Sequence, residues 1–381
     1  MNENALKELA KYGQSVWHDY IRRKEILSGT LKKRIDEDGL LGVTSNPSIF
    51  EKAIADSDDY DASIRQYVSE GLDAPQIFQK LAVEDIQNAT DAFRGVYERT
   101  GGRDGYVSLE VSPLLAHDTK ASLEEARRLF RTVNRPNVMI KIPGTKEGLP
   151  AIEQALSEGI NINITLLFGI ERYEEVAKIY LKALEKRLAE GKPVDRLASV
   201  ASVFVSRIDT LVDKQLGAKL ANAKTPEERK KIEAFTGKVA VANTKLIYQK
   251  FKEIFTPARF EQFAKKGARV QRPLWGSTST KNPKYSDILY VQDLIGRDTV
   301  NTMPTETIDA YLDHGKPRAD TIEAGLDEAR RIISQLPSVG TDLHAVTQQL
   351  EDNGVEAFAN DYKKLLASIE EKKKKSWAAS R

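Results

Sequence analysis

Short runs of Val, Ile, Leu and Phe alternate along the chain with longer, charged stretches in which apolar residues recur every three or four positions. The short runs are typical of strands buried on both faces, and the longer stretches are typical of amphipathic helices. This alternation predicts an α/β fold, with a parallel sheet and crossover helices. The apolar runs lie at residues 15–20, 41–46, 106–111, 138–142, 160–168, 199–204, 269–275 and 299–303.

Eight such runs match the strand number of a (β/α)8 barrel, so we predict a TIM barrel with additional helices. A barrel typically takes about 250 residues, and this chain has 381. The excess predicts helical insertions near residues 50–105 and 209–268 and a C-terminal helical extension at residues 355–381. Since no linker rich in Ser, Gly or Pro interrupts the chain, we expect a single domain over residues 1–381.

Composition narrows the range of partners. The 58 Lys and Arg residues nearly balance 56 Asp and Glu residues, so no global charge favours nucleic acid or an anionic membrane. The N-terminus carries acids and lacks an apolar leader, and no stretch approaches the roughly 20 apolar residues of a membrane span. We therefore expect a cytoplasmic protein.

The residue types also narrow the chemistry. The chain has no cysteine, and its four histidines lack the spacing of a helical metal pair. The glycine-rich fingerprints of dinucleotide and P-loop sites are missing as well. We expect neither a metal nor a cofactor, so the chemistry must come from side chains.

Lys141 stands inside the apolar run 138–142, where a cation is out of place. Burying an unpaired ammonium costs several kcal/mol, and a lysine avoids that cost by losing its proton. A neutral buried amine is a nucleophile that attacks carbonyl groups. The alternative is an ordinary edge-strand lysine that points to solvent.

In a (β/α)8 barrel, polar residues at the C-terminal ends of the strands point into the active-site mouth. Each of these residues also has a structural explanation when it is taken alone, such as a helix cap, a turn or a surface ion pair. A convergence of one amine, two carboxylates and several amides and hydroxyls on one mouth favours a functional site. The strand-end residues are Asp19, Thr44, Asn46, Glu110, Lys141, Asn163, Thr165, Ser202, Arg207, Ser277 and, beyond the seventh run, Lys281.

This set suits Schiff-base chemistry on a phosphorylated sugar. An amine attacks a ketone, one carboxylic acid protonates the departing water, and a second carboxylate removes the proton whose loss cleaves a carbon–carbon bond. Amide and hydroxyl side chains would hold the sugar hydroxyls, and basic side chains would bind a phosphate.

The segments that carry these residues resemble the transaldolases, in particular the long form of the family. They are GVTSNPS at 42–48, SLEVS at 108–112, KIPGTKEGL at 141–149, NINITLLF at 161–168, VFVSRID at 203–209 and RPLWGST at 272–278. Several motifs in the correct order, from about residue 19 to residue 305, make this resemblance specific. It implies a Schiff-base lysine on the fourth barrel strand, which falls on Lys141.

The same resemblance implies roles for the other residues. Asp19 would take the proton from the sugar hydroxyl, and Glu110 and Thr165 would relay protons through a bound water. The residues implied to hold the dihydroxyacetone part are Thr44, Asn46, Asn163, Ser202 and Phe204. Those implied to bind the phosphate are Arg207, Ser277 and Lys281, although shorter family members carry an arginine at the position of Ser279.

Two other functions remain open at this point. The related fructose-6-phosphate aldolases release free dihydroxyacetone, but they carry an amide and a tyrosine at the positions of Glu110 and Phe204. A barrel that only binds a phosphosugar would need no intact Lys141, Asp19 and Glu110. The resemblance implies transfer of a dihydroxyacetone unit from sedoheptulose 7-phosphate to glyceraldehyde 3-phosphate in the non-oxidative pentose phosphate pathway. The sequence leaves both a monomer and a homodimer open.

Overall fold

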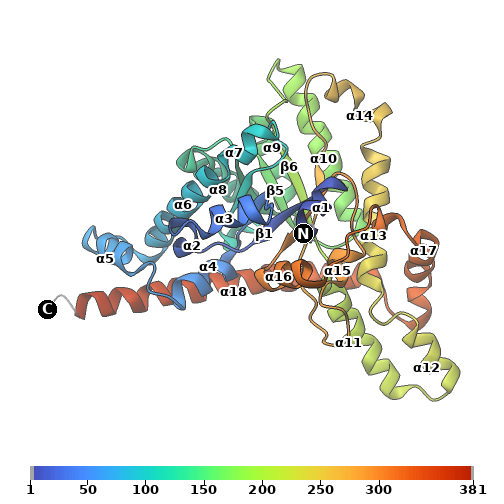
Figure 1. The fold of residues 1–381 in the computed structure, drawn as a ribbon. Coiled ribbons are helices and arrows are strands. Elements are labelled where there is room, and N and C mark those ends of the chain that lie inside the picture. The colour runs from blue at the N-terminus through green and yellow to red at the C-terminus, as the bar shows by residue number, and fades with distance from the viewer. Residues whose placement is uncertain (1–3, 379–381) are drawn as a thin grey trace.

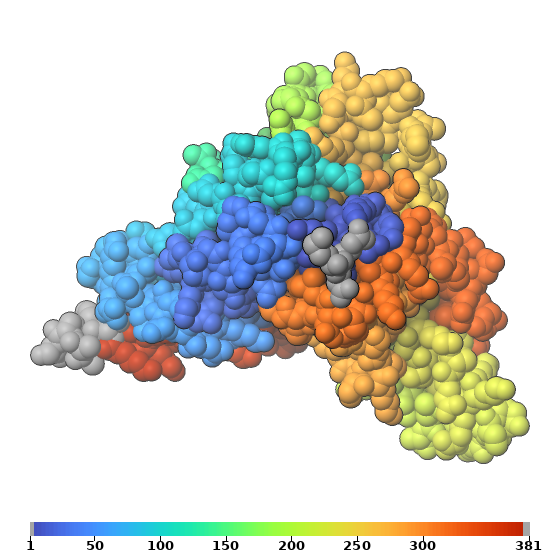
Figure 2. Space-filling view, in the orientation of Figure 1, coloured from blue at the N-terminus to red at the C-terminus, as the bar shows by residue number. Residues whose placement is uncertain are grey.

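The computed structural model describes residues 4–378, which contain a closed barrel of eight parallel strands in chain order (Figure 1). The last strand pairs with the first, so the barrel has no free edge. Because the last strand lies next to the first, residues near 300 lie beside the N-terminal segment at the surface (Figure 2). The strands are β1 Gln14–Asp19, β2 Gly42–Thr44, β3 Tyr106–Glu110, β4 Val138–Pro143, β5 Ile162–Leu167, β6 Ser199–Phe204, β7 Arg272–Gly276 and β8 Thr299–Met303.

The predicted fold class is therefore confirmed, and each predicted apolar run contains or overlaps a strand. Only β6 and β8 coincide with their runs at both ends. The second run extends to Asn46, but β2 stops at Thr44 because Asn46 caps the next helix, accepting a hydrogen bond from the Ile49 backbone N–H at 2.9 Å. The seventh run begins at residue 269, whereas β7 pairs with its neighbours only from Arg272.

Helices surround the barrel and fill the long gaps between strands (Figure 1). Four lie between β2 and β3, and four lie between β6 and β7. The α-helices are α1 Ala5–Lys11, α2 Arg23–Leu27, α3 Thr30–Glu37, α4 Pro47–Ala55, α5 Asp61–Ser69, α6 Ala74–Ala92, α7 Arg94–Arg99, α8 Thr119–Val133, α9 Gly148–Glu158, α10 Ile170–Ala189, α11 Ser206–Asn222, α12 Pro226–Glu233, α13 Val239–Ile254, α14 Pro257–Ala264, α15 Leu289–Gln292, α16 Thr305–His314, α17 Leu326–Gln335 and α18 Leu343–Ala378. Short 3-10 helices lie at Pro113–Leu115, Thr321–Glu323 and Leu336–Val339.

The C-terminal helix α18 is longer than the predicted extension, because it begins at Leu343 and not near residue 355. It runs along the barrel beside α4 and also contacts α5, α6 and α11 (Figure 1). Gly354 permits a close approach to the barrel, since a Cβ at this position would lie 2.8 Å from the Leu166 side chain. One helical turn later, Phe358 therefore reaches the barrel mouth.

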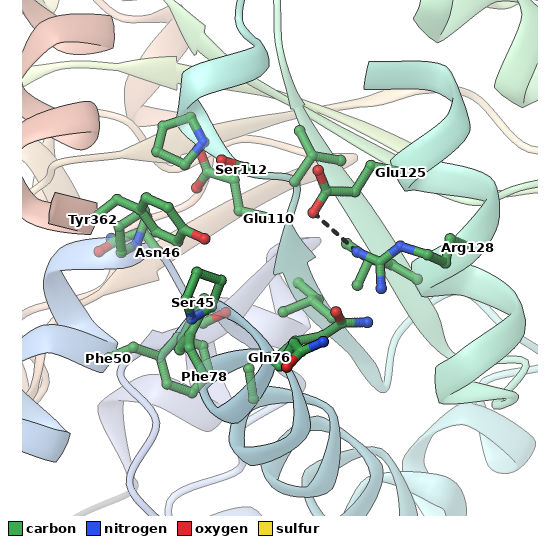
Figure 3. Close-up of a pocket in the computed structure, with 18 of the residues that line it drawn as sticks. Ser45, Asn46, Phe50, Gln76, Phe78, Glu110, Ser112, Glu125, Arg128 and Tyr362 are labelled. Carbon is green, nitrogen blue, oxygen red and sulfur yellow. Dashed lines mark hydrogen bonds and ion pairs between the residues drawn. The ribbon is translucent and has the colours of Figure 1, made fainter. Parts of the chain in front are cut away.

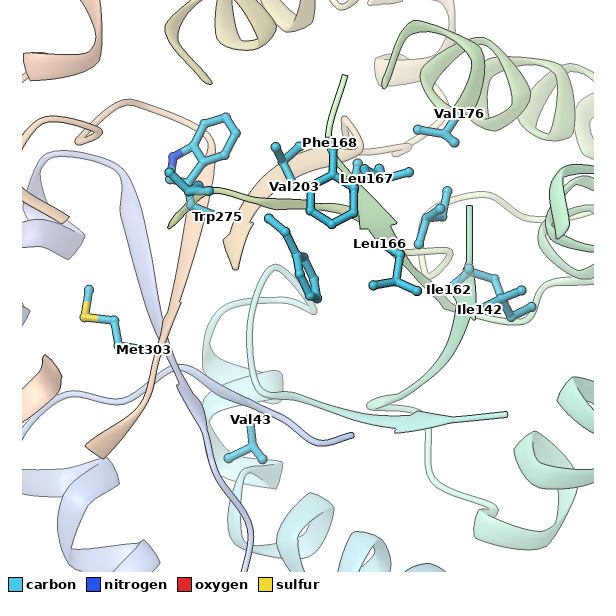
Figure 4. Close-up of a cluster of buried hydrophobic side chains, with 14 of the residues drawn as sticks. Val43, Ile142, Ile162, Leu166, Leu167, Phe168, Val176, Val203, Trp275 and Met303 are labelled. Carbon is cyan, nitrogen blue, oxygen red and sulfur yellow. The ribbon is translucent and has the colours of Figure 1, made fainter. Parts of the chain in front are cut away.

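The barrel strands bury different residues on their two faces, as the alternation of side chains along a strand requires. Outward side chains such as Val43, Val203 and Met303 pack in the large core beneath the helices (Figure 4). A separate cluster fills the lower part of the barrel, and its largest members are Trp17, Tyr97, Tyr106, Met139 and Leu274. Within residues 4–378, no helix has both the length and the apolar character needed to cross a lipid bilayer.

Candidate active site

A polar cavity of about 310 Å³ opens at the C-terminal ends of the strands. Its position follows from strand alternation. Trp17, Met139 and Val300 belong to the apolar cluster in the lower barrel, and the residues two positions later on the same strands line the cavity above. Nine of the predicted site residues line this cavity, namely Asp19, Thr44, Asn46, Lys141, Ser202, Phe204, Arg207, Ser277 and Lys281.

Lys141 and Glu110 form a buried ion pair at the base of the cavity. They face each other in the register of β3 and β4, with Lys141 Nζ 3.1 Å from Glu110 Oε2. Their side chains are only 4% and 3% exposed, and Lys141 Nζ also donates to the Ser45 carbonyl at 3.2 Å. Burial raises the pKa of the Glu110 carboxyl, and the Lys141 charge opposes that shift. A carboxyl with a raised pKa beside an amine can pass it a proton and take one back.

Asp19 supplies a carboxylate on the cavity wall. Its Oδ1 accepts a 2.6 Å hydrogen bond from Thr44 Oγ1, which also lies 2.6 Å from Thr302 Oγ1. Burial raises the pKa of Asp19, and the Lys141 charge and the Thr44 hydrogen bond oppose that shift. The two carboxyls thus lie in similar buried surroundings, but only Glu110 pairs directly with the amine.

The two remaining predicted polar residues, Asn163 and Thr165, lie on β5 and are fully buried. Asn163 Oδ1 accepts a 2.6 Å hydrogen bond from Ser202, and its Nδ2 donates to Ser108 Oγ at 3.0 Å, so the amide holds Ser202 in place. Thr165 Oγ1 has no hydrogen-bond partner within the described residues. The next residue, Leu166, has a φ of 59° at a register shift in β5, a strained geometry that often re-aims a side chain near a functional site.

One side of the cavity gathers basic groups. The Arg207 guanidinium lies 5.2 Å from the centre of the Phe204 ring, and burial lowers the pKa of Arg207. Ser277 adopts a φ of 52°, and its hydroxyl lies 3.0 Å from that of Ser206. Lys281 is exposed and donates to Ser279 at 2.5 Å, so it brings a charge to the segment that carries arginine in shorter relatives.

Several residues that line the cavity were absent from the predicted set, among them Thr302 and Phe358. Thr302 lies on the predicted eighth strand, and the strand-end argument that selected Thr44 applies to it equally. Phe358 comes from α18, and its ring lies 5.7 Å from Lys141 Nζ, 5.9 Å from the Arg207 guanidinium and 6.4 Å from the Phe204 ring. In the sequence, Phe358 is one apolar residue in a helical pattern, so no local signal marks it.

Within residues 4–378, no group of three or more His, Asp or Glu side chains is arranged to hold a metal ion. The donors of the site are an amine, carboxyls, hydroxyls and amides. Such a set can form and hydrolyse an iminium with a ketone and can move protons on either side of it.

Comparison with known proteins agrees with this chemistry. Residues 16–369 match the family described as Transaldolase/Fructose-6-phosphate aldolase. The chain is 48% identical to Transaldolase 2 of Nostoc sp. over 97% of its own length and 98% of that protein. It is 45% identical to the Transaldolase of Trichodesmium erythraeum, over 98% and 99% of the two chains, and 44% identical to that of Thermobifida fusca, over 96% and 97%. The chain belongs to the transaldolase/fructose-6-phosphate aldolase family.

Proposed function

We propose that this protein is a transaldolase. It moves a dihydroxyacetone unit from sedoheptulose 7-phosphate to glyceraldehyde 3-phosphate, which gives erythrose 4-phosphate and fructose 6-phosphate. The observation that carries the proposal is the buried Lys141–Glu110 pair at 3.1 Å, at the base of a cavity that Asp19 also lines. Sequence identity of 45–48% to proteins named transaldolase, over nearly the full length of the chain, supports the same reaction.

The reaction begins when Glu110 takes a proton from Lys141 and leaves the amine neutral. The amine adds to the ketose carbonyl to form a carbinolamine, and a protonated Glu110 then gives its proton to the leaving hydroxyl, which departs as water. Thr165 assists this relay through a bound water. The product is a positively charged iminium on Lys141.

Carbon–carbon cleavage follows on the other wall of the cavity. Asp19 removes the proton from the hydroxyl next to the scissile bond, the bond electrons flow into the iminium, and the aldose phosphate leaves. The three-carbon enamine stays on Lys141. It then attacks the carbonyl carbon of the acceptor aldehyde, Asp19 returns the proton, and hydrolysis of the new iminium releases the product ketose.

We assign substrate binding to the remaining side chains. Arg207, Ser277 and Lys281 bind the phosphate, since they form the basic side of the cavity. The dihydroxyacetone part is held by Thr44, Asn46, Ser202 and, through its hydrogen bond to Ser202, Asn163. Asn46 uses its side-chain oxygen to cap α4, so its amide nitrogen is the group left for substrate. The proposal includes a cytoplasmic location and sugar phosphates as the small-molecule partners, and it applies to a monomer and to a homodimer alike.

The alternative within the family is a lyase that releases free dihydroxyacetone. Phe204 lines the cavity and packs against Phe168 and Phe358, at 5.7 and 6.4 Å between ring centres. A phenyl ring cannot hold a water for attack on the three-carbon intermediate, so that intermediate waits for an aldehyde acceptor. This favours a transferase.

Two variants test the proposal. Lys141→Arg keeps a cation beside Glu110 but removes the nucleophile, so we expect a folded protein without turnover in a coupled assay of fructose 6-phosphate with erythrose 4-phosphate. Phe204→Tyr places a hydroxyl at the cavity wall, so we expect more free dihydroxyacetone per transfer. Turnover by Lys141→Arg would contradict the Schiff-base mechanism. Release of dihydroxyacetone as the main wild-type activity would support the lyase.

A further inference from the structure

A second cavity, of about 240 Å³, lies beside the carboxyl ends of β2 and β3, between the barrel and the surrounding helices. It is bounded by the ends of β2 and β3 and by α4, α6, α8 and α18 (Figure 3). The exposed residues Asp73, Pro75 and Gln76 line its outer part. Ser45 and Glu110 line it as well, and the side chains of both are buried. The cavity therefore extends from solvent to the backbone of Glu110, and the carboxylate that pairs with the catalytic amine lies buried beneath that wall.

Only a thin wall separates the two cavities. Asn46 lines both of them, Lys141 lines the first, and Glu110 lines the second. Both carboxylate oxygens of Glu110 are buried, and within the described residues neither has a hydrogen bond of good geometry beyond the ion pair with Lys141. A carboxylate has about four acceptor sites, so Glu110 keeps unused capacity for water.

We propose that this second cavity is a water channel that carries water and protons between Glu110 and solvent. The inference rests on the proposed function. Imine formation breaks the carbon–oxygen bond of the carbinolamine, and the oxygen leaves as water with a proton from Glu110. Release of the product ketose consumes one water, which adds to the iminium and returns a proton to Glu110. Each turnover thus moves one water out and one water in beside this carboxyl.

The main cavity offers that water a poor exit. During the reaction a sugar phosphate occupies the mouth above Lys141, and the Phe204 and Phe358 rings form part of its wall. Phenyl rings offer no partner to a water molecule, and the same rings protect the three-carbon intermediate. Water traffic through the second cavity separates the two needs.

The second cavity is suitable for water in size and lining. Its volume is far above the ~15 Å³ that one water needs. Polar groups lie along its length: Glu125 and Arg128 form an ion pair at 3.3 Å, and Ser112 and Tyr362 also line the cavity (Figure 3). Gln76 adds an amide near the outside. Ordered water needs such partners.

The test fills the channel without touching Glu110, Asn46 or Lys141. Gln79→Trp adds bulk at a half-buried lining position of α6, and Ala82→Leu adds it at a buried one. Asn88→Trp is the matched control, because Asn88 is exposed on the same helix and does not line the cavity. Melting temperatures establish that each variant is folded. Gln79→Trp keeps the test valid if the buried leucine is not tolerated.

The readout is the fate of the carbonyl oxygen of fructose 6-phosphate labelled with oxygen-18. Mass spectrometry measures label lost to water, after subtraction of loss without enzyme, and a coupled assay measures transfer. In the wild type, the released water escapes and label loss accompanies imine formation. In a blocked channel, the same water returns to the iminium, so we expect the ratio of label loss to transfer to fall about tenfold, an effect of ~1.4 kcal/mol on escape.

The two proposals can fail separately. If folded Gln79→Trp loses label at the wild-type ratio, or if Asn88→Trp slows label loss equally, the channel assignment is wrong while the transaldolase stands. If the wild type shows no transfer, the proposed function itself is wrong.

Discussion

Glu110→Gln is the sharpest perturbation of the site, because it keeps the size of the side chain and removes one charge. The carboxylate lies 3.1 Å from Lys141 Nζ and both side chains are nearly inaccessible. With an effective dielectric constant of about 20, Coulomb's law gives roughly 5 kcal/mol at this distance. Breaking a buried pair typically costs about 3–5 kcal/mol. We therefore expect about 3 kcal/mol lower stability at neutral pH.

The kinetic effect should fall on imine formation. A positioned acid–base group contributes about 10²–10⁴ in rate, so Glu110→Gln should slow formation of the iminium by about that factor. Asp19 still performs carbon–carbon cleavage in this variant. Cleavage measured from a preformed iminium should therefore change much less.

Rapid-quench trapping with borohydride separates the steps, since it captures the iminium at each time after mixing with fructose 6-phosphate. Glu110→Asp keeps the charge but moves it farther from Lys141, so its rate of iminium formation should lie between those of the wild type and Glu110→Gln. Glu124→Gln, at an exposed position of α8, is the control for loss of one negative charge. An iminium that forms in Glu110→Gln at the wild-type rate would refute the role of Glu110.

Three further predictions follow from the surroundings of the site. Phe358 is only 3% exposed, so Phe358→Ala should lower the free energy of unfolding by about 3–5 kcal/mol in a denaturant titration. It should also raise the release of free dihydroxyacetone by admitting water, and Phe358→Leu should show smaller changes in both. Unchanged release in Phe358→Ala would contradict the shielding role of the ring. Arg207→Ala should lower kcat/KM for sugar phosphates by an amount equivalent to about 1.5–3 kcal/mol of transition-state stabilisation. Lys281 is exposed, so Lys281→Ala should lower kcat/KM by the equivalent of less than about 1 kcal/mol. The reverse order in steady-state kinetics would overturn the phosphate assignment. Burial, with a smaller contribution from Arg34, lowers the pKa of His18 to about 3. Below about pH 6.5 the unfolded chain binds a proton at His18 and the folded chain does not, so the free energy of unfolding should fall as the pH drops from 6.5 towards 3. In urea titrations, His18→Gln should reduce this pH dependence by up to about 1.4 kcal/mol per pH unit. An unchanged pH dependence would show that other groups cause the acid lability.

The sequence predicted the barrel because its strands are short apolar runs separated by amphipathic helices, a pattern that survives without tertiary information. β6 and β8 begin and end where the pattern predicts. The pattern misplaced the end of β2, because Asn46 serves as a helix cap and strand propensity alone does not register that bond. The start of α18 was missed because the prediction began from the apolar period near Leu365, whereas the helix starts 22 residues before it, at Leu343.

The candidate site was predictable where it lies on strands, since strand ends of a closed barrel converge by geometry. Phe358 was not, because only the packing of α18 against the barrel, allowed by Gly354, brings it to Lys141. The pairing of Lys141 with Glu110 was predictable only in part. The strand ends predicted carboxylates at the same mouth as the lysine, and the structure places one of them, Glu110, directly beside the amine.

The central claim is that Lys141 forms the covalent intermediate. Borohydride reduction in the presence of fructose 6-phosphate, followed by peptide mass mapping, tests it most directly. We expect a reduced three-carbon adduct on Lys141, since the aldose phosphate leaves before an acceptor arrives. A folded, active protein with an unmodified Lys141, or with the adduct on another lysine, would contradict it.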